Sequence, residues 1–314
     1  MRAGQAMDAP LQGRVALITG GGRGIGLAIA QRLHQLGAAV SIVDPGWSID
    51  GRPEDDGLAA RTATELGGGA LGLPLDAASA DGAEQAVART VERFGALDIV
   101  VNNAAILRDA FIFKARSADW QEVLRVNLQG PIGLLAQATP VMREQVKAGR
   151  PSGRIVNIVS SAGLYGNFGQ FAYASAKAGL FGLTRVAALD LARLGITCNA
   201  VAPFAATRVT HTIQPANEAQ GRYKERALRV GAEHVARLVA GLCLEAARGI
   251  TGQLFGVRGR EVFLFNQPRP VSRMVAAPPA WEEGKLVAAM EREFGALFTP
   301  DTTDLEAFNT EPEV

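Results

Sequence analysis

Cysteine and histidine are scarce in this chain, and their scarcity argues against two kinds of protein. Of the 314 residues only two are cysteine, Cys198 and Cys243, and three are histidine, His34, His211 and His234. Two cysteines cannot build a disulfide framework, and none of these five residues has a second ligand at the spacing of a metal site. We therefore expect two reduced thiols in or near the core and no bound metal.

Long apolar runs and an excess of charge of either sign are also missing. Nowhere do the ~18 consecutive apolar residues of a membrane-spanning helix occur, and residues 1–14 contain no apolar stretch typical of a signal peptide. Lysine and arginine number 32 against 31 aspartate and glutamate, so no overall field favours nucleic acid or an anionic membrane. The sequence predicts a cytoplasmic protein with no membrane or nucleic-acid partner.

What the chain does contain is a regular alternation of two hydrophobic patterns. Short β-branched runs alternate with longer stretches of helical period, which is typical of repeated βαβ units and a parallel sheet. Pro203 should end regular structure after the sixth strand. Strands are expected at residues 15–19, 39–43, 70–75, 99–102, 154–160 and 197–201. Helices are expected at residues 24–36, 58–66, 82–94, 119–146 and 172–194.

This count predicts an α/β fold, a Rossmann-type doubly wound parallel sheet of about seven strands. A seventh strand is expected at residues 253–257, and the apolar run at residues 262–265 would complete a terminal hairpin. We expect a single domain over residues 14–267, after an N-terminal segment at residues 1–13.

Residues 268–314 are expected to form a C-terminal extension. Four prolines mark a linker, residues 281–294 have the pattern of a short amphipathic helix, and the acidic, threonine-rich end after Pro300 is expected to be a loosely held tail. The extension could wrap a neighbouring subunit, shield the substrate entrance or pack passively.

A glycine-rich loop, TGGGRGIG at residues 19–26, follows the first expected strand and opens a helix. In that context backbone amides at the positive end of a helix can bind a pyrophosphate. Gly20 would permit the tight turn, Gly24 a close approach of backbone to phosphate, and Gly26 close packing of helix on strand. The alternative is a merely flexible turn.

Two acidic residues at strand ends are candidates for cofactor contacts. Asp44 ends the second strand, where a carboxylate can accept hydrogen bonds from the adenosine ribose and would repel a 2′-phosphate. Arg23 in the loop could attract that phosphate, so NAD is favoured and NADP stays open. Asp76 ends the third strand and could receive the adenine amino group or cap the next helix.

Four further residues could carry acid–base chemistry together. Tyr173 and Lys177 are four apart at the start of an expected helix, so the phenol and the ammonium share one face. A nearby lysine cation can lower the tyrosine pKa toward neutrality. Ser160, at the end of the fifth strand, could polarise a carbonyl or alkoxide, and Asn127 could hold a water in a proton path. Each residue taken singly also has an ordinary structural interpretation.

The order and spacing of these motifs resemble the short-chain dehydrogenase/reductase family over residues 14–257. The matching motifs are TGGGRGIG, NNAA at residues 102–105, Asn127, Ser160 and the Tyr173/Lys177 pair. By that resemblance Tyr173 is the acid/base, and Lys177 lowers its pKa and holds the nicotinamide ribose. Ser160 orients the reacting oxygen, and Asn127 anchors a relay water.

The same resemblance implies a set of ligand contacts. The cofactor contacts are Gly20, Arg23, Gly24, Ile25, Gly26, Asp44, Asp76, Ala77, Asn103, Ala104, Ala105, Tyr173, Lys177, Pro203 and Thr207. The substrate contacts are Ser160, Phe168 and Tyr173. Two positions depart from the family pattern: Ala105 stands where glycine is usual, and Phe204 replaces the glycine that commonly follows Pro203.

A narrower resemblance points to a substrate. NNAAILRD at residues 102–109, YGNFGQ at 165–170 and NAVAPFAATRVT at 199–210 resemble the (3R)-hydroxyacyl-CoA dehydrogenase unit of peroxisomal multifunctional β-oxidation enzymes and its bacterial relatives. That group generally uses NAD and also lacks the glycine after the proline. The resemblance implies reversible, NAD-dependent oxidation of a small molecule, a (3R)-3-hydroxyacyl-CoA. It also implies a dimer or tetramer formed through the two long helices.

Two other functions stay open. The first is a hydroxysteroid or alicyclic alcohol dehydrogenase with an apolar pocket lined by Phe111, Phe113, Leu164 and Phe168. The second is a catalytically silent, NAD-sensing regulator, against which the intact catalytic residues argue. Several basic residues could meet CoA phosphates or form a solvated helix face: Arg208, Arg222, Lys224, Arg226 and Arg229.

Overall fold

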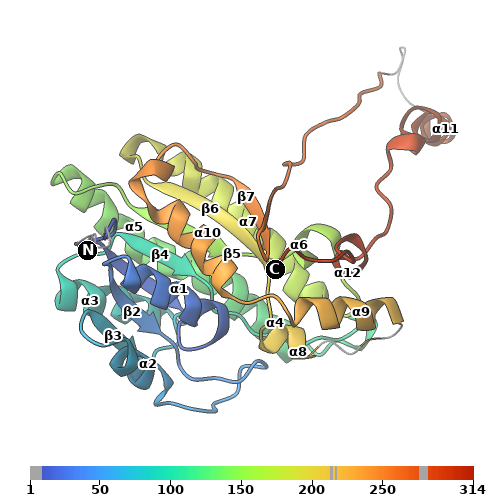
Figure 1. Ribbon diagram of the computed structural model, residues 1–314. Helices are drawn as coiled ribbons and strands as arrows, with labels where there is room; N and C mark the ends of the chain where they lie inside the picture. Colours follow the sequence, from blue (N-terminus) through green and yellow to red (C-terminus); the bar gives the residue numbers. More distant parts are fainter. Residues whose placement is uncertain (1–8, 213–214, 216–217, 276–281) are drawn as a thin grey trace, which may run out of the picture.

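A computed structural model of the protein describes residues 9–212, 215, 218–275 and 282–314. Its centre is an eight-stranded sheet in the order β3-β2-β1-β4-β5-β6-β7-β8 (Figure 1). β8 pairs antiparallel with β7, and the other neighbouring strands pair in parallel. The doubly wound sheet predicted from the sequence is confirmed, with the predicted hairpin as its last two strands. The strands are β1 Val15–Thr19, β2 Ala39–Val43, β3 Ala70–Leu73, β4 Ile99–Asn102, β5 Arg154–Ile158, β6 Thr197–Phe204, β7 Leu254–Arg258 and β8 Glu261–Leu264.

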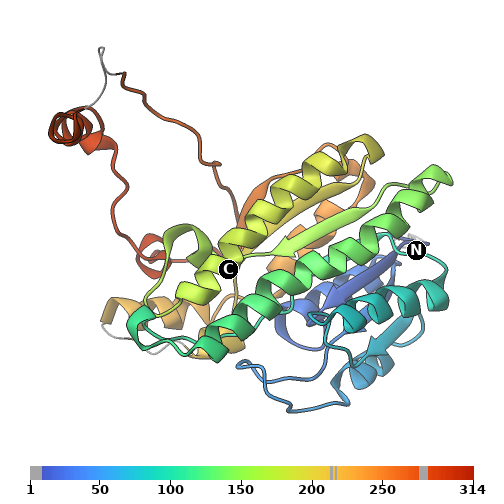
Figure 2. The same cartoon turned by 180° about the vertical axis from the view of Figure 1, so that it is seen from behind.

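Helices cover both faces of the sheet, and the central strands β1, β4 and β5 are therefore buried along their whole length. In β1 every residue is buried; Ile18 packs in the core on one face and Leu17 in the core on the other. Figures 1 and 2 show the two helical layers from opposite sides. One layer holds α1 Gly24–Gln35, α2 Leu58–Leu66 and α10 Glu233–Cys243, and the other holds α3 Ala80–Phe94, α5 Gly130–Lys147 and α7 Phe171–Asp190.

Shorter helices cluster around the end of the sheet where the site lies. They are α4 Ser117–Leu124, α6 Ala162–Tyr165, α8 Arg208–Thr212, α9 Glu218–Ala227 and α12 Asp304–Ala307. Cys198 and Cys243 are buried free thiols, as predicted. Within the described part of the chain no helix is both long and apolar enough to cross a membrane.

Two predicted elements are wrong in detail. The helix expected at residues 119–146 is broken by a wider π-helical segment, Arg125–Gln129, which contains Asn127 and separates α4 from α5. Strand β6 also continues through Pro203 to Phe204. Beyond Val201 this strand pairs only with β7, and a proline is tolerated where one side of a strand has no partner.

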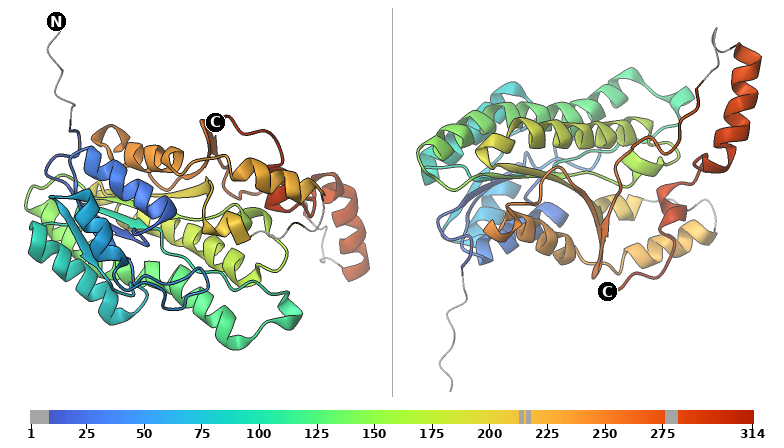
Figure 3. Two further views of the ribbon diagram at one scale, coloured as in Figure 1. Left: turned by 60° about the horizontal axis from the view of Figure 1, so that its bottom comes forward. Right: turned by 90° about the horizontal axis from the view of Figure 1, so that it is seen from above.

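The C-terminal extension leaves the body and returns to it. Helix α11, Glu283–Phe294, stands away from the rest of the protein (Figures 1 and 3), and the start of its predicted range, Trp281, lies outside the described residues. The chain then folds back so that α12 packs against α6 and α9. Leu305 and Asp304 are buried there, so the prediction of a loosely held tail after Pro300 is wrong.

Candidate active site

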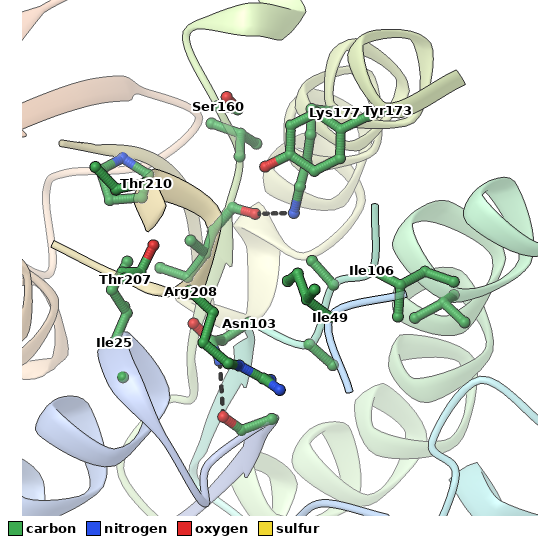
Figure 4. Close-up of a pocket in the computed structure, with 18 of the residues that line it drawn as sticks. Ile25, Ile49, Asn103, Ile106, Ser160, Tyr173, Lys177, Thr207, Arg208 and Thr210 are labelled. Carbon is green, nitrogen blue, oxygen red and sulfur yellow. Dashed lines mark hydrogen bonds between the residues drawn. The ribbon is translucent and has the colours of Figure 1, made fainter. Parts of the chain in front are cut away.

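A cavity of about 690 Å³ opens at the carboxyl edge of the sheet. Its lining includes residues at or just after the ends of β1, β2, β4, β5 and β6. Doubly wound sheets bind ligands at this edge, because the strand order reverses there and leaves a crevice between adjacent loops. The cavity extends from the glycine-rich loop, represented by Ile25 in Figure 4, to Ser160 and Tyr173, which lie apart from that loop.

The glycine-rich loop has the geometry that a dinucleotide requires. A Cβ on Gly26 would lie 2.1 Å from the carbonyl oxygen of Gly20, so only glycine fits where α1 packs on the loop. Gly24 lines the cavity with φ +54°, and no atom lies within 4 Å of the place its Cβ would take. No side chain caps α1 at Arg23. The positive end of the helix is therefore available to a phosphate.

Hydrogen bonds between neighbouring strand ends hold this loop in place. The Thr19 hydroxyl accepts from the backbone amides of Asn103 at 3.0 Å and Ala104 at 3.1 Å. In return the Asn103 side-chain amide donates to the carbonyls of Thr19 at 2.9 Å and Gly20 at 3.1 Å (Figure 4). The NNAA motif after β4 thus braces the loop after β1, which fixes the floor of the cavity.

Asp44 is held as a carboxylate acceptor at the end of β2. Its two oxygens accept from the backbone amides of Gly22 at 3.0 Å and Gly46 at 2.9 Å, and the side chain borders the cavity. Arg23, the residue that could attract a 2′-phosphate, forms an ion pair with Glu54. This pairing leaves less free positive charge beside the expected ribose position.

Asp76 also lines the cavity, but it does not cap the following helix. The cap of α3 is Ser79, whose hydroxyl accepts from the amide of Gly82 at 2.9 Å. The carboxylate of Asp76 instead accepts from the amide of Ala78 and from Arg125 at 2.8 Å. The structure thus excludes the capping alternative and leaves Asp76 at the cavity wall.

Ser160, Tyr173 and Lys177 meet at the other end of the cavity. Ser160 lies in the loop after β5, and the other two residues lie one turn apart on α7. Ser160 and Tyr173 both line the cavity there, and the Lys177 ammonium lies 5.7 Å from the centre of the Tyr173 ring. Lys177 donates to the carbonyl of Ile158 at 2.7 Å, which fixes the ammonium below the phenol (Figure 4).

Burial controls the protonation of Tyr173 and Lys177. Desolvation raises the pKa of Tyr173 to about 12, against the opposing effect of the nearby Ser160 hydroxyl, so the expected lowering by Lys177 is not seen here. Desolvation also lowers the pKa of Lys177 to about 8. Near neutrality the phenol is therefore protonated and poised as a proton donor, with a lysine cation beside it.

Asn127 is fully buried, and its side chain hydrogen-bonds to the backbone of a single residue, Ile106. The side-chain oxygen accepts from the amide of Ile106 and the side-chain nitrogen donates to its carbonyl, both at 2.9 Å. The side chain therefore fixes the chain segment after the NNAA motif, Asn102–Ala105. Asn127 itself does not line the cavity.

Most other predicted ligand contacts do line the cavity. Those that do are Gly20, Arg23, Gly24, Ile25, Asp44, Asp76, Ala77, Asn103, Ala104, Ala105, Tyr173, Lys177, Pro203 and Thr207. Gly26 lies behind the wall, where it has the packing position expected of it. Phe168 lies on the cavity rim with an exposed fraction of 71%, and Phe111 joins it, whereas Phe113 and Leu164 do not contribute.

The basic residues offered as CoA contacts separate into two groups. Arg208 lines the cavity, and its guanidinium donates to the carbonyl of Trp47 at 3.1 Å. The other four meet partners on the protein: Arg222 pairs with Glu218, Arg226 and Arg229 pair with Glu311, and Lys224 donates to the carbonyl of His211.

Several cavity residues were not predicted from the sequence. Asp304 and Leu305 come from the C-terminal extension, Tyr223 comes from α9, and Asp109 follows the NNAA motif. The sequence offered a weak signal for the first pair, because Thr303 and Glu306 have the spacing of a helix-capping box, which the structure forms. That signal marks the start of a helix and says nothing about what the helix contacts.

A doubly wound sheet with this loop after its first strand, and with a serine, a tyrosine and a lysine at the same edge, defines the class of dinucleotide-binding dehydrogenases. Residues 14–220 match the family model described as short chain dehydrogenase. The chain belongs to this family and is an oxidoreductase that acts on CH–OH groups.

Similar proteins of known name cover nearly the whole chain. Hydroxyacyl-CoA dehydrogenase ChsB1 of Mycobacterium tuberculosis is 36% identical over 90% of this chain and 89% of its own. The 3-oxoacyl-[acyl-carrier-protein] reductase FabG of Aquifex aeolicus is 38% identical over 81% and 99% of the two chains.

Solved structures give the same result for the fold. A short chain dehydrogenase from Mycobacterium avium matches with a TM-score of 0.78 and 33% identity, over 92% of this chain and 97% of that one. A 3-ketoacyl-(acyl-carrier-protein) reductase from Brucella melitensis complexed with NADH matches with a TM-score of 0.71 and 27% identity, over 80% and 98%.

Proposed function

We propose that this protein is an NAD-dependent dehydrogenase that interconverts a 3-hydroxyacyl and a 3-oxoacyl thioester, with (3R)-3-hydroxyacyl-CoA as its substrate. The observation that carries the proposal is that Ser160, Tyr173 and Lys177 meet at one end of a cavity whose other end is the glycine-rich loop. These residues lie where a substrate oxygen and a dinucleotide can meet.

The chemistry follows from the protonation of these side chains. A nicotinamide dinucleotide bound along the cavity supplies or accepts the hydride. In the reducing direction the Tyr173 phenol donates its proton to the substrate oxygen, and Ser160 holds that oxygen by a hydrogen bond. The Lys177 cation favours the phenolate that remains. In the oxidising direction the same phenolate takes the proton of the alcohol.

Two features support NAD over NADP. The Asp44 carboxylate borders the cavity at the end of β2, where it would accept hydrogen bonds from ribose hydroxyls and repel a 2′-phosphate. Arg23 is paired with Glu54 and so offers less charge to that phosphate. The NADH complex of the Brucella melitensis reductase agrees with this choice.

The names of the relatives support an acyl thioester. Both a hydroxyacyl-CoA dehydrogenase and a 3-oxoacyl-[acyl-carrier-protein] reductase resemble this chain over at least 81% of its length. Phe111 and Phe168 at the cavity rim offer an apolar surface to an acyl chain. The same rim would suit a hydroxysteroid, so the substrate panel below includes one.

We also propose self-association through the two long helices of one layer. Ile132 on α5 and Val186 and Leu189 on α7 are exposed apolar side chains, with Leu189 69% exposed. Burying such side chains between two copies would stabilise a dimer or tetramer. Sedimentation of the protein with and without charged substitutions at Leu189 would test this.

The experiment that tests the function is a substrate panel with each nicotinamide. The protein should reduce acetoacetyl-CoA with NADH and oxidise (3R)-3-hydroxybutyryl-CoA with NAD, with little activity on the 3S isomer or on hydroxysteroids. Turnover of a hydroxysteroid without turnover of either thioester would contradict the proposed substrate. Binding of NAD without turnover of any alcohol would instead favour the NAD-sensing alternative.

A further inference from the structure

The last twelve residues, which we call the C-terminal segment (residues 303–314), contribute Asp304 and Leu305 to the cavity wall. Asp304 opens α12, and its backbone amide donates to the carbonyl of Gly166, just after α6. Its carboxylate accepts from the hydroxyl of Ser161 at 2.8 Å. Ser161 directly follows Ser160, so the segment places an acidic side chain beside the reacting end of the cavity.

The segment is anchored firmly enough to hold that side chain there. Arg258, with a side chain only 8% exposed, donates to the carbonyls of Phe308 and Thr310 and to the Thr310 hydroxyl. The Phe308 ring packs against Phe204 at 4.5 Å between ring centres, and against Tyr165 and two further rings. Buried hydrogen bonds and ring contacts of this kind leave little freedom to the segment.

The Asp304 carboxylate carries a charge that nothing in the described residues neutralises. Asp304 forms no ion pair with a described residue, and its second oxygen, Oδ1, is buried without a hydrogen-bond partner among them. The described cations lining the cavity are Arg23, Lys177 and Arg208. Arg23 is paired with Glu54, and Arg208 lies toward Asn103 at the opposite end (Figure 4), while Lys177 is bound to the Ile158 carbonyl.

We propose that Asp304 is a specificity-determining residue that excludes substrates with a carboxylate two bonds from the reacting carbon. A 3-oxoacyl thioester and the corresponding free acid differ at C1, two bonds from the carbon that is reduced. With the C3 oxygen held by Ser160 and Tyr173, the proposed binding mode would place C1 in the space that Asp304 borders. The site would therefore accept the uncharged thioester and reject the free acid. This inference rests on the proposed function for the position of the reacting oxygen.

Electrostatics at this end of the cavity support the proposal. Burial raises the pKa of Asp304 to about 6, against the hydrogen bond from Ser161, so the group is a carboxylate at about pH 8. Asp109 is a second acidic residue on the cavity wall, bonded to Gln170, and burial raises its pKa too. After desolvation, which is the largest cause, both carboxyl groups also raise the pKa of Tyr173.

The test compares two probes of nearly equal size, acetoacetamide and acetoacetate. Full-length protein is saturated with oxidised NAD, which cannot reduce either ketone, and each Kd is measured by calorimetry at about pH 8. We expect the wild type to bind acetoacetamide at least about tenfold more tightly than acetoacetate, the factor that corresponds to ~1.4 kcal/mol. Equal affinities in the wild type would overturn the proposal without any variant.

Two substitutions sharpen the comparison. Asp304→Asn removes the charge and keeps an oxygen for Ser161, so the ratio of the two Kd values should fall toward one. Glu313→Gln makes the same change of charge on an exposed residue of the segment that pairs with Arg260, and it should leave the ratio unchanged. An unchanged ratio in Asp304→Asn, or an equal fall in Glu313→Gln, would overturn the proposal.

The binding measurement separates this inference from the proposed function. If the wild type prefers the amide but reduces neither acetoacetyl-CoA nor acetoacetamide with NADH, the exclusion of carboxylates stands and the proposed reaction fails. If it reduces acetoacetyl-CoA and acetoacetate with similar kcat/KM, the reaction stands and the inference fails.

Discussion

The hydroxyl of Ser161 donates a hydrogen bond to the carboxylate of Asp304, which lies 143 residues later in the chain. One end of this bond belongs to the loop that carries Ser160, and the other belongs to the last helix of the protein. The loop after β5 and the C-terminal segment therefore form one structural unit. A substitution that loosens the C-terminal segment should therefore also change the positions of Ser160 and Tyr173.

Replacing Arg258 with methionine should release the C-terminal segment. The substitution removes hydrogen bonds from a buried guanidinium to Phe308 and Thr310, at a cost of about 2–3 kcal/mol in unfolding free energy. Arg260→Met is the matched control, because Arg260 is 66% exposed and its pairing with Glu313 contributes little.

Limited proteolysis and chemical denaturation would check this prediction. Arg258→Met should be cleaved within residues 300–314 at protease concentrations that leave the wild type and Arg260→Met intact. It should also lose activity on thioesters in proportion to that opening. Equal cleavage of all three proteins would show that Arg258 does not hold the segment.

Replacing Asp44 with alanine should change the choice of cofactor. The carboxylate would accept from ribose hydroxyls and repel a 2′-phosphate, so its loss should weaken NADH binding and strengthen NADPH binding relative to it. Because Asp44 also accepts from Gly22 and Gly46, both affinities should fall somewhat through a looser loop. The informative quantity is the ratio of the two Kd values by fluorescence titration. A parallel fall that leaves this ratio unchanged would mean that Asp44 only shapes the loop.

The activity of the protein should fall as the pH rises through about 8. Burial lowers the pKa of Lys177 to about 8, so its cation is present below that pH and lost above it, whereas Tyr173, with a pKa of about 12, stays protonated. The effect on stability has the opposite sign. Between about pH 8 and the usual lysine pKa of about 10.5 the unfolded chain holds a proton that the folded one has released, so this group makes stability rise with pH.

Two measurements over the same pH range would check these predictions. A profile of kcat/KM for ketone reduction tests the fall in activity, and the free energy of unfolding tests the rise in stability. The expected profile is flat below about pH 7 and declines above about pH 8 while the protein remains folded. A profile that rises through this range would indicate that a different group controls the reaction.

The sheet and the glycine-rich loop were predictable because their signals are local. The bounds of β1, β2 and β4 agree with the predicted strands, and α2 agrees with its predicted helix. A strand buried on both faces is rich in apolar residues, and in a helix that lies on it the apolar residues recur every three to four positions. The sequence therefore marks both kinds of element. The roles predicted for Gly24 and Gly26 rest on local backbone geometry in the same way.

Departures from prediction arose where distant parts of the chain decide the structure. The π-helical segment around Asn127 occurs where that side chain binds the backbone of Ile106, a contact that periodicity does not reveal. The sequence showed that Phe204 departs from the family pattern, but not why. In the structure its ring packs against that of Phe308.

The C-terminal segment is the clearest case of a structure decided by distant contacts. Its acidic, threonine-rich composition predicts a loose tail, yet Asp304 is buried, and its carboxylate accepts a hydrogen bond from the hydroxyl of Ser161. Glu311 likewise pairs with Arg226 and Arg229. From the sequence alone, these two arginines could have bound CoA phosphates or formed part of a solvated helix face. Such pairings depend on the folded arrangement.

The central claim is that the Tyr173 phenol carries the proton during hydride transfer, and Tyr173→Phe tests it most directly. Phenylalanine keeps the ring that packs beside Lys177 and removes only the hydroxyl. NADH binding and the turnover of acetoacetyl-CoA should be measured on the same preparation. The account predicts that kcat falls by at least about a hundredfold, within the range for loss of a general acid, while the Kd for NADH changes little. Turnover near the wild-type rate would contradict it.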